Sequence, residues 1–205
     1  MKIDKVIKIL QKKYKIKPWK ANPFKILIST ILSQRTKDEV TREASKRLFR
    51  FADTPKKILK LSEKQITKLI YPTGFYRQKA KRIKKVCKII LEKNKGKVPN
   101  SREELVKLPG VGSKTASVVL AYGFRVPTIP VDVHVNRISK RLGLVPDNYK
   151  PDKTQEVLEK MIPKNLHIMV NHLLVTFGKD ICRPVKPRCR ICPILKFCPY
   201  EKKNL

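Results

Sequence analysis

Apolar residues recur at helical spacing along almost the whole chain, and this feature restricts the fold more than any other. In residues 1–15 the apolar positions fall on one face of a helix, as expected for an amphipathic segment. Residues 24–32 are apolar almost throughout, which predicts a helix buried on all sides. No stretch alternates between apolar and polar residues for long enough to form a strand. The pattern therefore predicts an all-α protein.

Helix start signals place the elements along the chain. Asn22-Pro23 and Thr54-Pro55 each combine an N-cap residue with a proline at the first helical position. The capping-box pattern, serine or threonine three positions before glutamate or glutamine, begins at Thr36, Ser62 and Ser101. With Gly74 and Gly96 as stops, we expect helices over 1–15, 22–32, 36–50, 54–61, 62–74, 77–93, 101–108, 113–122, 132–142, 152–162 and 165–177. Gly123, Pro127 and Pro130 mark a break where the chain could cross to a second domain.

The charge balance indicates the class of partner. The chain has 49 Lys and Arg against 16 Asp and Glu, a formal charge of +33 that internal ion pairs cannot neutralise. An excess of this size favours a polyanion, and nucleic acid over membrane, because the basic residues are spread over most helices. No segment approaches the ~18 apolar residues of a transmembrane helix, and the start is too charged for a signal peptide. We therefore expect an intracellular protein of the cytoplasm or nucleoid that is not secreted. We also expect it to be a monomer.

The stretch Leu108-Pro109-Gly110-Val111-Gly112-Ser113-Lys114-Thr115-Ala116 combines a tight turn with a helix start. Pro109 and Gly110 end the preceding helix, and glycine at 110 and 112 permits a positive φ or the close approach of a ligand to the backbone. A helix that opens after such a hairpin points unpaired N–H groups outward, where a phosphate oxygen fits. We therefore expect Gly110, Val111 and Gly112 to contact nucleic acid.

Lys114 lies in the first turn of the helix that follows this hairpin. The helix dipole, neighbouring cations and desolvation all disfavour its charge, and together they can lower its pKa from about 10.4 toward ~7–8, where lysine is a nucleophile. The alternative is a solvated charge that only holds phosphate.

Asp132 follows Pro130 and directly precedes a predicted helix. It is either an N-cap, a common role for aspartate, or a carboxylate that faces Lys114 across a cleft between two domains; a cap that fixes its position would serve both roles. We expect His134, His167 and His172 to be structural.

Cys182, Cys189, Cys192 and Cys198 form the pattern C-x6-C-x2-C-x5-C. Thiolates this close in sequence can surround one tetrahedral metal or one cubane, so the spacing leaves zinc and a [4Fe-4S] cluster both open. Cys87 stands alone on the apolar face of a helix, which indicates a core residue.

Three motifs, the hairpin with Lys114, the segment Val131-Asp132-x-His134 and the cysteine pattern, together resemble the endonuclease III family of helix-hairpin-helix DNA glycosylases. The resemblance runs from about residue 20 to 200, in the same order. It implies a six-helix barrel domain over 16–126 that contains the helix-hairpin-helix. It also implies a discontinuous helical domain, 1–15 with 127–205, whose four-cysteine loop holds a [4Fe-4S] cluster rather than zinc.

The resemblance also implies a function. The protein would be a base-excision-repair DNA glycosylase with AP lyase activity, which removes oxidised pyrimidines from double-stranded DNA. Lys114 would be the nucleophile, Asp132 the essential carboxylate, and the abasic strand would be cleaved on its 3′ side by β-elimination through a lysine Schiff base. The DNA partner would contain damaged bases or abasic sites.

Two departures from the family pattern affect how the DNA is read. In Ser33-Gln34-Arg35-Thr36, the family usually has glutamine where this chain has Arg35, with Gln34 one position early. By the resemblance, that residue would fill the gap left by the flipped base. Arginine could still fill it and bond to the orphan base, most naturally a guanine, so the opposite-base preference can differ from that of the family. Phe75 resembles a second wedge that is usually aliphatic, and it could instead be a buried core residue.

Two other functions fit part of the pattern. One is a mismatch glycosylase that acts on uracil or thymine opposite guanine, or on adenine; Arg35 favours it and Lys114 disfavours it. The other is a non-catalytic iron–sulfur protein that uses the hairpin only to bind DNA.

Overall fold

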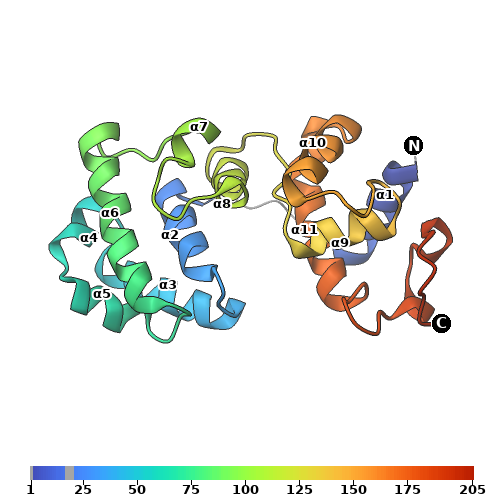
Figure 1. The fold of residues 1–205 in the computed structure, drawn as a ribbon, viewed down its shortest axis with the longest axis horizontal. Helices are drawn as coiled ribbons and strands as arrows, with labels where there is room; N and C mark the ends of the chain where they lie inside the picture. The colour runs from blue at the N-terminus through green and yellow to red at the C-terminus, as the bar shows by residue number, and fades with distance from the viewer. Residues whose placement is uncertain (1, 17–20) are drawn as a thin grey trace. The chain divides into compact units, whose positions relative to one another are not determined.

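A computed structural model describes residues 2–16 and 21–205 of the chain (Figure 1). Within these residues there is no β-strand, which confirms the all-α prediction. The elements are α1 (Lys2–Tyr14), α2 (Pro23–Ser33), α3 (Asp38–Phe51), α4 (Pro55–Lys60), α5 (Glu63–Ile70), α6 (Tyr76–Asn94), α7 (Arg102–Leu105), α8 (Ser113–Val118), the π-helical η1 (Val119–Phe124), α9 (Val133–Arg141), α10 (Pro151–Met161), α11 (His167–Asp180) and the 3-10 helices η2 (Lys164–Leu166), η3 (Cys189–Ile191) and η4 (Leu195–Phe197). No helix of the described residues is long and apolar enough to span a membrane.

The chain divides into two compact units, and each is described by itself. The middle unit comprises Lys20–Val126, with α2 to α8 and η1. The end unit combines Met1–Trp19 with Pro127–Leu205, so that α1 packs with helices from the C-terminal half. Residues 17–20, where the two units join, lie outside the described part of the chain.

Helix α2 is the centre of the middle unit. It contacts α3, α6, α8 and η1 (Figure 1). Its side chains from Phe24 to Leu32 are mostly buried, as the continuous apolar run predicts. Its N-terminus is capped by Asn22, whose side chain accepts the N–H groups of Phe24 and Lys25. The packing on all sides fixes both ends of α2, and the C-terminal end leads directly into the loop that carries Gln34 and Arg35.

The helix start signals are confirmed at most positions. Thr54 accepts the Lys57 N–H, and Ser62 with Gln65 forms the full reciprocal capping box. Ser101 makes half of one: it accepts the Glu104 N–H, while the Glu104 carboxylate pairs with Lys107 instead. These signals are local, so they act largely independently of the rest of the fold.

The capping box predicted at Thr36 is wrong. The N-cap of α3 is Lys37, which makes no side-chain cap. The Thr36 hydroxyl is engaged elsewhere: it donates to the carbonyl of Gln34 and accepts from the N–H of Gly74 and the amine of Lys79. Contacts from distant segments thus take the hydroxyl away from the helix that follows it.

The end unit has its own hydrophobic core. Helix α11 packs against α1 and α9, and α9 also contacts α10. The buried residues of this core come from α1, the segment before α9, α9, α10, α11 and the final loop. After α11 the chain forms a loop with only the short helices η3 and η4, and partly buried Cys182, Cys192 and Cys198 pack against the core.

Gly74 provides a stability test of the turn before α6. A Cβ at this position would collide with the carbonyl oxygen of Arg35, which is backbone and cannot move aside easily. We expect Gly74→Ala to lower the free energy of unfolding by about 1–3 kcal/mol, as overpacking does. The measurement is chemical denaturation followed by circular dichroism.

Gly112→Ala is the matched control. A Cβ there has no atom within 4 Å, and the backbone is extended with φ −92°. We expect a change of less than about 0.5 kcal/mol. Equal losses in the two variants would contradict the close approach at Gly74.

Candidate functional site

The hairpin between α7 and α8 contains two glycines, and Gly110 has a positive φ while Gly112 does not. Gly110 has φ +77°, and a Cβ there would collide with the side chain of Arg82. Gly112 is extended and faces open space, so its value lies in leaving the backbone accessible. Val111 is 5% exposed and its N–H donates to the carbonyl of Leu108 at 3.0 Å. Its side chain is therefore part of the core, and its N–H is engaged within the hairpin.

Arg102 connects α7 to α8 by hydrogen bonds. Its guanidinium donates to the hydroxyls of Ser113 at 2.7 Å and Ser117 at 2.9 Å. Gly112 is the N-cap of α8, and this residue supplies no side-chain acceptor to the N–H groups of the first turn. Lys114 is exposed in this first turn. The hairpin thus presents accessible backbone and a solvent-accessible amine on one rigid support.

The loop after α2 contacts this hairpin, and the turn before α6 contacts that loop. The Gln34 amide donates to the carbonyl of Gly110 at 2.8 Å and accepts from Arg82 at 3.3 Å. Arg35 and Phe75 both have left-handed backbones, φ 50° and φ 57°, and the Arg35 guanidinium lies 5.5 Å from the centroid of the Phe75 ring. Phe75 is 54% exposed, so the alternative that it is a buried core residue is wrong.

Lys79 and Arg82 of α6 are site residues that the sequence analysis missed. Lys79 is 2% exposed, and its amine donates to the carbonyls of Leu32 and Gln34. Burial, and to a smaller extent the charge of Arg82, lowers the pKa of Lys79 to about 8. A cavity of about 220 Å³ is lined by Gln34, Arg35, Phe75, Gln78, Lys79 and Arg82. The sequence did hold a signal, because Lys79 lies four residues before the inward-facing Ile83, on the apolar face of α6.

Asp132 caps α9 in the end unit. Its Oδ1 accepts the N–H groups of His134 and Val135, both at 2.9 Å. The side chain is half-buried, and Oδ2 has no hydrogen-bond partner among the described residues. The cap therefore fixes the carboxylate while leaving one oxygen available for chemistry. Lys114 and Asp132 belong to different units.

The three histidines have structural surroundings. His134 stands 3.1 Å from the guanidinium of Arg137 and packs against Gly178, where a Cβ would not fit. His167 is buried and its Nε2 contacts the carbonyl of Ile162 at 2.8 Å. Burial lowers the pKa of both His134 and His172.

The four cysteines of the final loop are half-buried in the end unit with free thiols. Burial first, and then the neighbouring thiols of Cys182, Cys198 and Cys189, raise the pKa of Cys192 to about 11. The described residues include no group of three or more His, Cys, Asp or Glu side chains that could hold a metal ion. Arg141 donates to the Cys182 sulfur at 3.4 Å.

Cys87 is separate from this group. It is fully buried in the middle unit and burial raises its pKa to about 12, in accord with the core role predicted for it.

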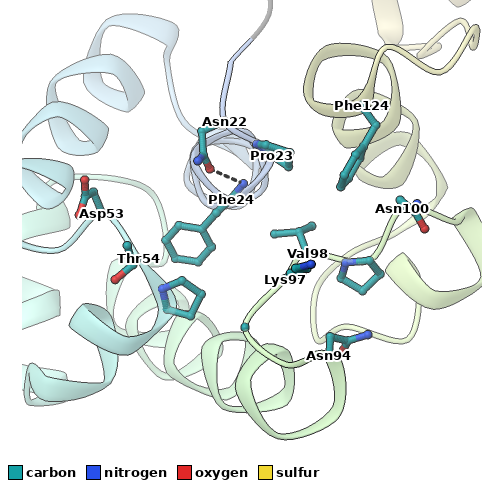
Figure 2. A pocket seen from close by; sticks show the side chains of 13 residues that line it. Asn22, Pro23, Phe24, Asp53, Thr54, Asn94, Lys97, Val98, Asn100 and Phe124 are labelled. Carbon is teal, nitrogen blue, oxygen red and sulfur yellow. Dashed lines mark hydrogen bonds between the residues drawn. The ribbon is translucent and has the colours of Figure 1, made fainter.

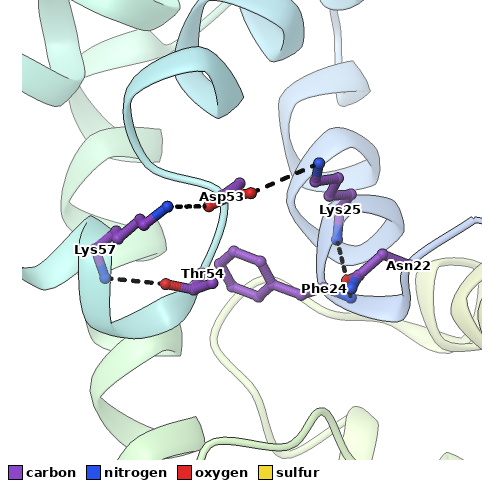
Figure 3. Close-up of polar contacts among 6 residues, drawn as sticks. All are labelled: Asn22, Phe24, Lys25, Asp53, Thr54 and Lys57. Atoms are coloured by element: carbon purple, nitrogen blue, oxygen red, sulfur yellow. Dashed lines mark hydrogen bonds and ion pairs between the residues drawn. The ribbon is translucent and has the colours of Figure 1, made fainter.

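A further cavity of the middle unit is lined by none of these residues. It measures about 610 Å³, and Figure 2 shows Phe24, Val98 and Phe124 around it, at the N-terminal end of α2. Three polar residues of its wall have partners within the protein (Figure 3): Asp53 accepts from Lys57 at 2.9 Å and pairs with Lys25 at 3.9 Å, and Asn22 and Thr54 cap the helices that follow them. This cavity holds none of the predicted site residues.

Comparison with known proteins identifies the class. Residues 28–164 match the family described as HhH-GPD superfamily base excision DNA repair protein. Among curated relatives, endonuclease III of Thermotoga maritima is 43% identical over 202 residues, 98% of this chain and 94% of the relative. Endonuclease III of Bacillus subtilis is 39% identical over 184 residues, 90% of this chain and 84% of the relative.

Solved structures agree with this result. A structure described as a trapped endonuclease III–DNA covalent intermediate has a TM-score of 0.89 and 36% identity, and the match covers 98% of this chain and 96% of that one. A thermostable thymine-DNA glycosylase also reaches a TM-score of 0.89, at 25% identity, over 97% and 96% of the two chains.

The helix-hairpin-helix, the all-helical fold and these matches define a base-excision-repair enzyme. The chain belongs to the endonuclease III family, and it is accordingly a DNA glycosylase and AP lyase. The resemblance inferred from three short motifs is confirmed over nearly the full length of the chain.

Proposed function

We propose that this glycosylase and lyase removes oxidised pyrimidines from double-stranded DNA, with Lys114 as its nucleophile and Asp132 as its essential carboxylate. The observation that carries the proposal is the placement of Lys114: an exposed amine in the first turn of α8, directly after the open backbone of Gly112. The relative described as a covalent intermediate with DNA supports a nucleophile of this kind.

The proposed reaction begins with a flipped base. A damaged nucleotide leaves the helical stack at a cost of a few kcal/mol, and this cost is lower for a damaged pair. As the base departs with the bonding electrons, positive charge develops on the sugar, and the carboxylate of Asp132 stabilises it. The neutral Lys114 amine bonds to C1′, and opening of the sugar ring with loss of a proton from nitrogen gives the Schiff base. Loss of a C2′ proton then expels the 3′ phosphate by β-elimination.

The hairpin is proposed to hold the DNA backbone. The first turn of α8 has no side-chain cap, and a phosphate oxygen can accept its N–H groups. Glycine at position 112 lets the phosphate approach the backbone closely. The formal charge of +33 adds a long-range attraction to DNA. We propose that the middle unit is the six-helix barrel domain and the end unit the cluster domain, in a monomeric intracellular protein.

The final loop is proposed to bind a [4Fe-4S] cluster through Cys182, Cys189, Cys192 and Cys198. The donor set fits, since four thiols lie in one short loop and three of them pack against the core of the end unit. The bound cluster would supply cross-links that order this loop. Arg141 supports the same loop through the carbonyls of Arg183 and Pro184. Arg188, Arg190 and Lys196 would then offer charge to phosphates from an ordered loop.

A mismatch glycosylase is the second candidate. It is favoured by Arg35, which can donate two hydrogen bonds to an orphan guanine, and by the likeness to a thymine-DNA glycosylase. The presence of Lys114 favours the lyase, because base removal by water needs no amine.

Borohydride trapping on abasic DNA tests the nucleophile. Reduction of the Schiff base should link the wild-type protein covalently to the DNA, and Lys114→Gln should abolish the adduct because glutamine cannot form it. Lys114→Arg is the matched control for charge: it should bind DNA nearly as well and still give no adduct. Base release by wild-type protein without any adduct would instead support the mismatch glycosylase.

Asp132 can be separated into its two roles by substitution. Asparagine is as good an N-cap as aspartate, so Asp132→Asn should keep the stability while slowing base release by at least roughly 100-fold. Asp132→Ala should slow it as much and also lower the free energy of unfolding by about 1 kcal/mol. Base release kinetics and thermal unfolding measure the two effects. Full activity in Asp132→Asn would leave Asp132 as a cap only.

The purified protein should be brown, with absorbance near about 400 nm from thiolate-bound iron. We expect Cys189→Ser to lose this band and Cys87→Ser to retain it, because Cys87 lies buried in the other unit. A colourless wild-type protein that contains zinc would contradict the cluster.

A further inference from the structure

We propose that Lys79 is a positioning residue that holds Arg35 and Phe75 together as a single stacked wedge, and that this wedge sets the opposite-base preference. The inference rests on the proposed DNA-repair function, since it assigns a task to residues that face the DNA in that function. It concerns the middle unit alone.

Lys79 binds the loop around Arg35 from inside the protein. Its Nζ donates to the carbonyl of Leu32 at 2.7 Å, the carbonyl of Gln34 at 2.6 Å and the hydroxyl of Thr36 at 3.0 Å. These acceptors lie on both sides of Arg35 in the sequence, so one amine fixes the whole turn. An ammonium offers three donors from a single atom, which no neutral side chain does.

The same hydrogen-bond junction, formed by Lys79 and Thr36, also fixes the turn that carries Phe75. The Thr36 hydroxyl that accepts from Lys79 also accepts the N–H of Gly74 at 3.0 Å. Gly74 lies so close to the carbonyl of Arg35 that no side chain fits between them. The Lys79 N–H in turn donates to the carbonyl of Phe75 at 3.0 Å. The positions of Arg35 and Phe75 are therefore not independent.

The backbone shows why a strong anchor is needed. Arg35 and Phe75 are both non-glycine residues in the left-handed region, which costs roughly 1–2 kcal/mol for each. This geometry brings the Arg35 guanidinium over the Phe75 ring at 5.5 Å while Phe75 remains 54% exposed. An exposed aromatic ring stacked on a cation is suited to enter a gap in a base stack and to donate hydrogen bonds there.

A second connection ties the wedge to the phosphate-binding hairpin. Gln34, whose backbone carbonyl accepts from Lys79, donates through its side-chain amide to the carbonyl of Gly110. Arg82, less than one turn after Lys79 on α6, contacts Gln34 and packs against Gly110. The spacing between the wedge and the hairpin is therefore set by α6.

Burial of the Lys79 ammonium carries a desolvation cost, so a role in fold stability alone does not explain it. It is 2% exposed and has no carboxylate partner among the described residues. At neutral pH the ammonium still predominates, because its pKa, lowered by burial, is about 8. A buried cation whose only partners are carbonyl and hydroxyl oxygens contributes little net stability. A requirement for one fixed geometry of the loop around Arg35 explains the presence of Lys79 better.

The test compares Lys79→Met with Lys85→Met. Methionine keeps the length and loses the donors, and Lys85 is an exposed lysine on the same helix that controls for the loss of one charge. Each protein is assayed on duplexes with thymine glycol opposite each of the four bases, on duplexes with 2-aminopurine opposite an abasic site, and by borohydride trapping on a single-stranded abasic oligonucleotide, which has no opposite base.

For Lys79→Met we expect duplex kcat/KM to fall on the order of 10- to 100-fold, as it does when a positioned group moves by about 1 Å. The differences among opposite bases should largely disappear, and the change in 2-aminopurine fluorescence on binding should be lost. Trapping on the single strand should stay within about twofold of wild type, since the wedge is not used there. Lys85→Met should keep the opposite-base preference.

Thr36→Val is the second variant, in case Lys79→Met does not fold. It removes the hydroxyl that joins Lys79 to Gly74 without changing the shape of the side chain, and it should show the same pattern in weaker form. The inference is wrong if the folded variants retain the wild-type opposite-base preference, or if they lose single-strand trapping as strongly as duplex activity. If wild type itself gives no adduct on either substrate, the proposed lyase mechanism fails instead.

Discussion

The burial of α2 on all sides is the constraint on which the rest of the middle unit depends. Its apolar side chains pack against α3, α6, α8 and η1, so neither end of the helix can shift without disturbing the core. The N-terminal end is closed by the Asn22 cap beside the large cavity. The C-terminal end leads into the loop with Gln34 and Arg35, and the Gln34 amide donates to the carbonyl of Gly110 in the hairpin.

Around this frame, the distribution of charge separates two uses of lysine and arginine. Most of the 49 basic residues are exposed and supply the general attraction to a polyanion. A few are placed by hydrogen bonds to backbone oxygens: Lys79 at the loop after α2, Arg137 at the carbonyl of Cys182, and Arg141 at the carbonyl of Arg183. These cations order the loops on which the proposed DNA contacts and cluster ligands lie.

How far the sequence could be interpreted depended on how local each signal was. The caps at Asn22, Thr54 and Ser62 were predicted correctly, because each joins residues two or three positions apart. The Thr36 capping box was wrong, since its hydroxyl is claimed by Gly74 and Lys79, which are 38 and 43 positions away. No local pattern reports contacts of that separation.

The sequence by itself determined that the chain is helical, where its helices begin, and which family it belongs to, since helical period, caps and the three motifs are written in neighbouring residues. Only the tertiary structure decided that Phe75 is exposed, that Asp132 caps α9 through one carboxylate oxygen, and that Lys79 is the centre of a junction. The physical reason is that exposure and hydrogen-bond choice depend on which distant segments arrive at the same place, and packing of the whole unit sets this.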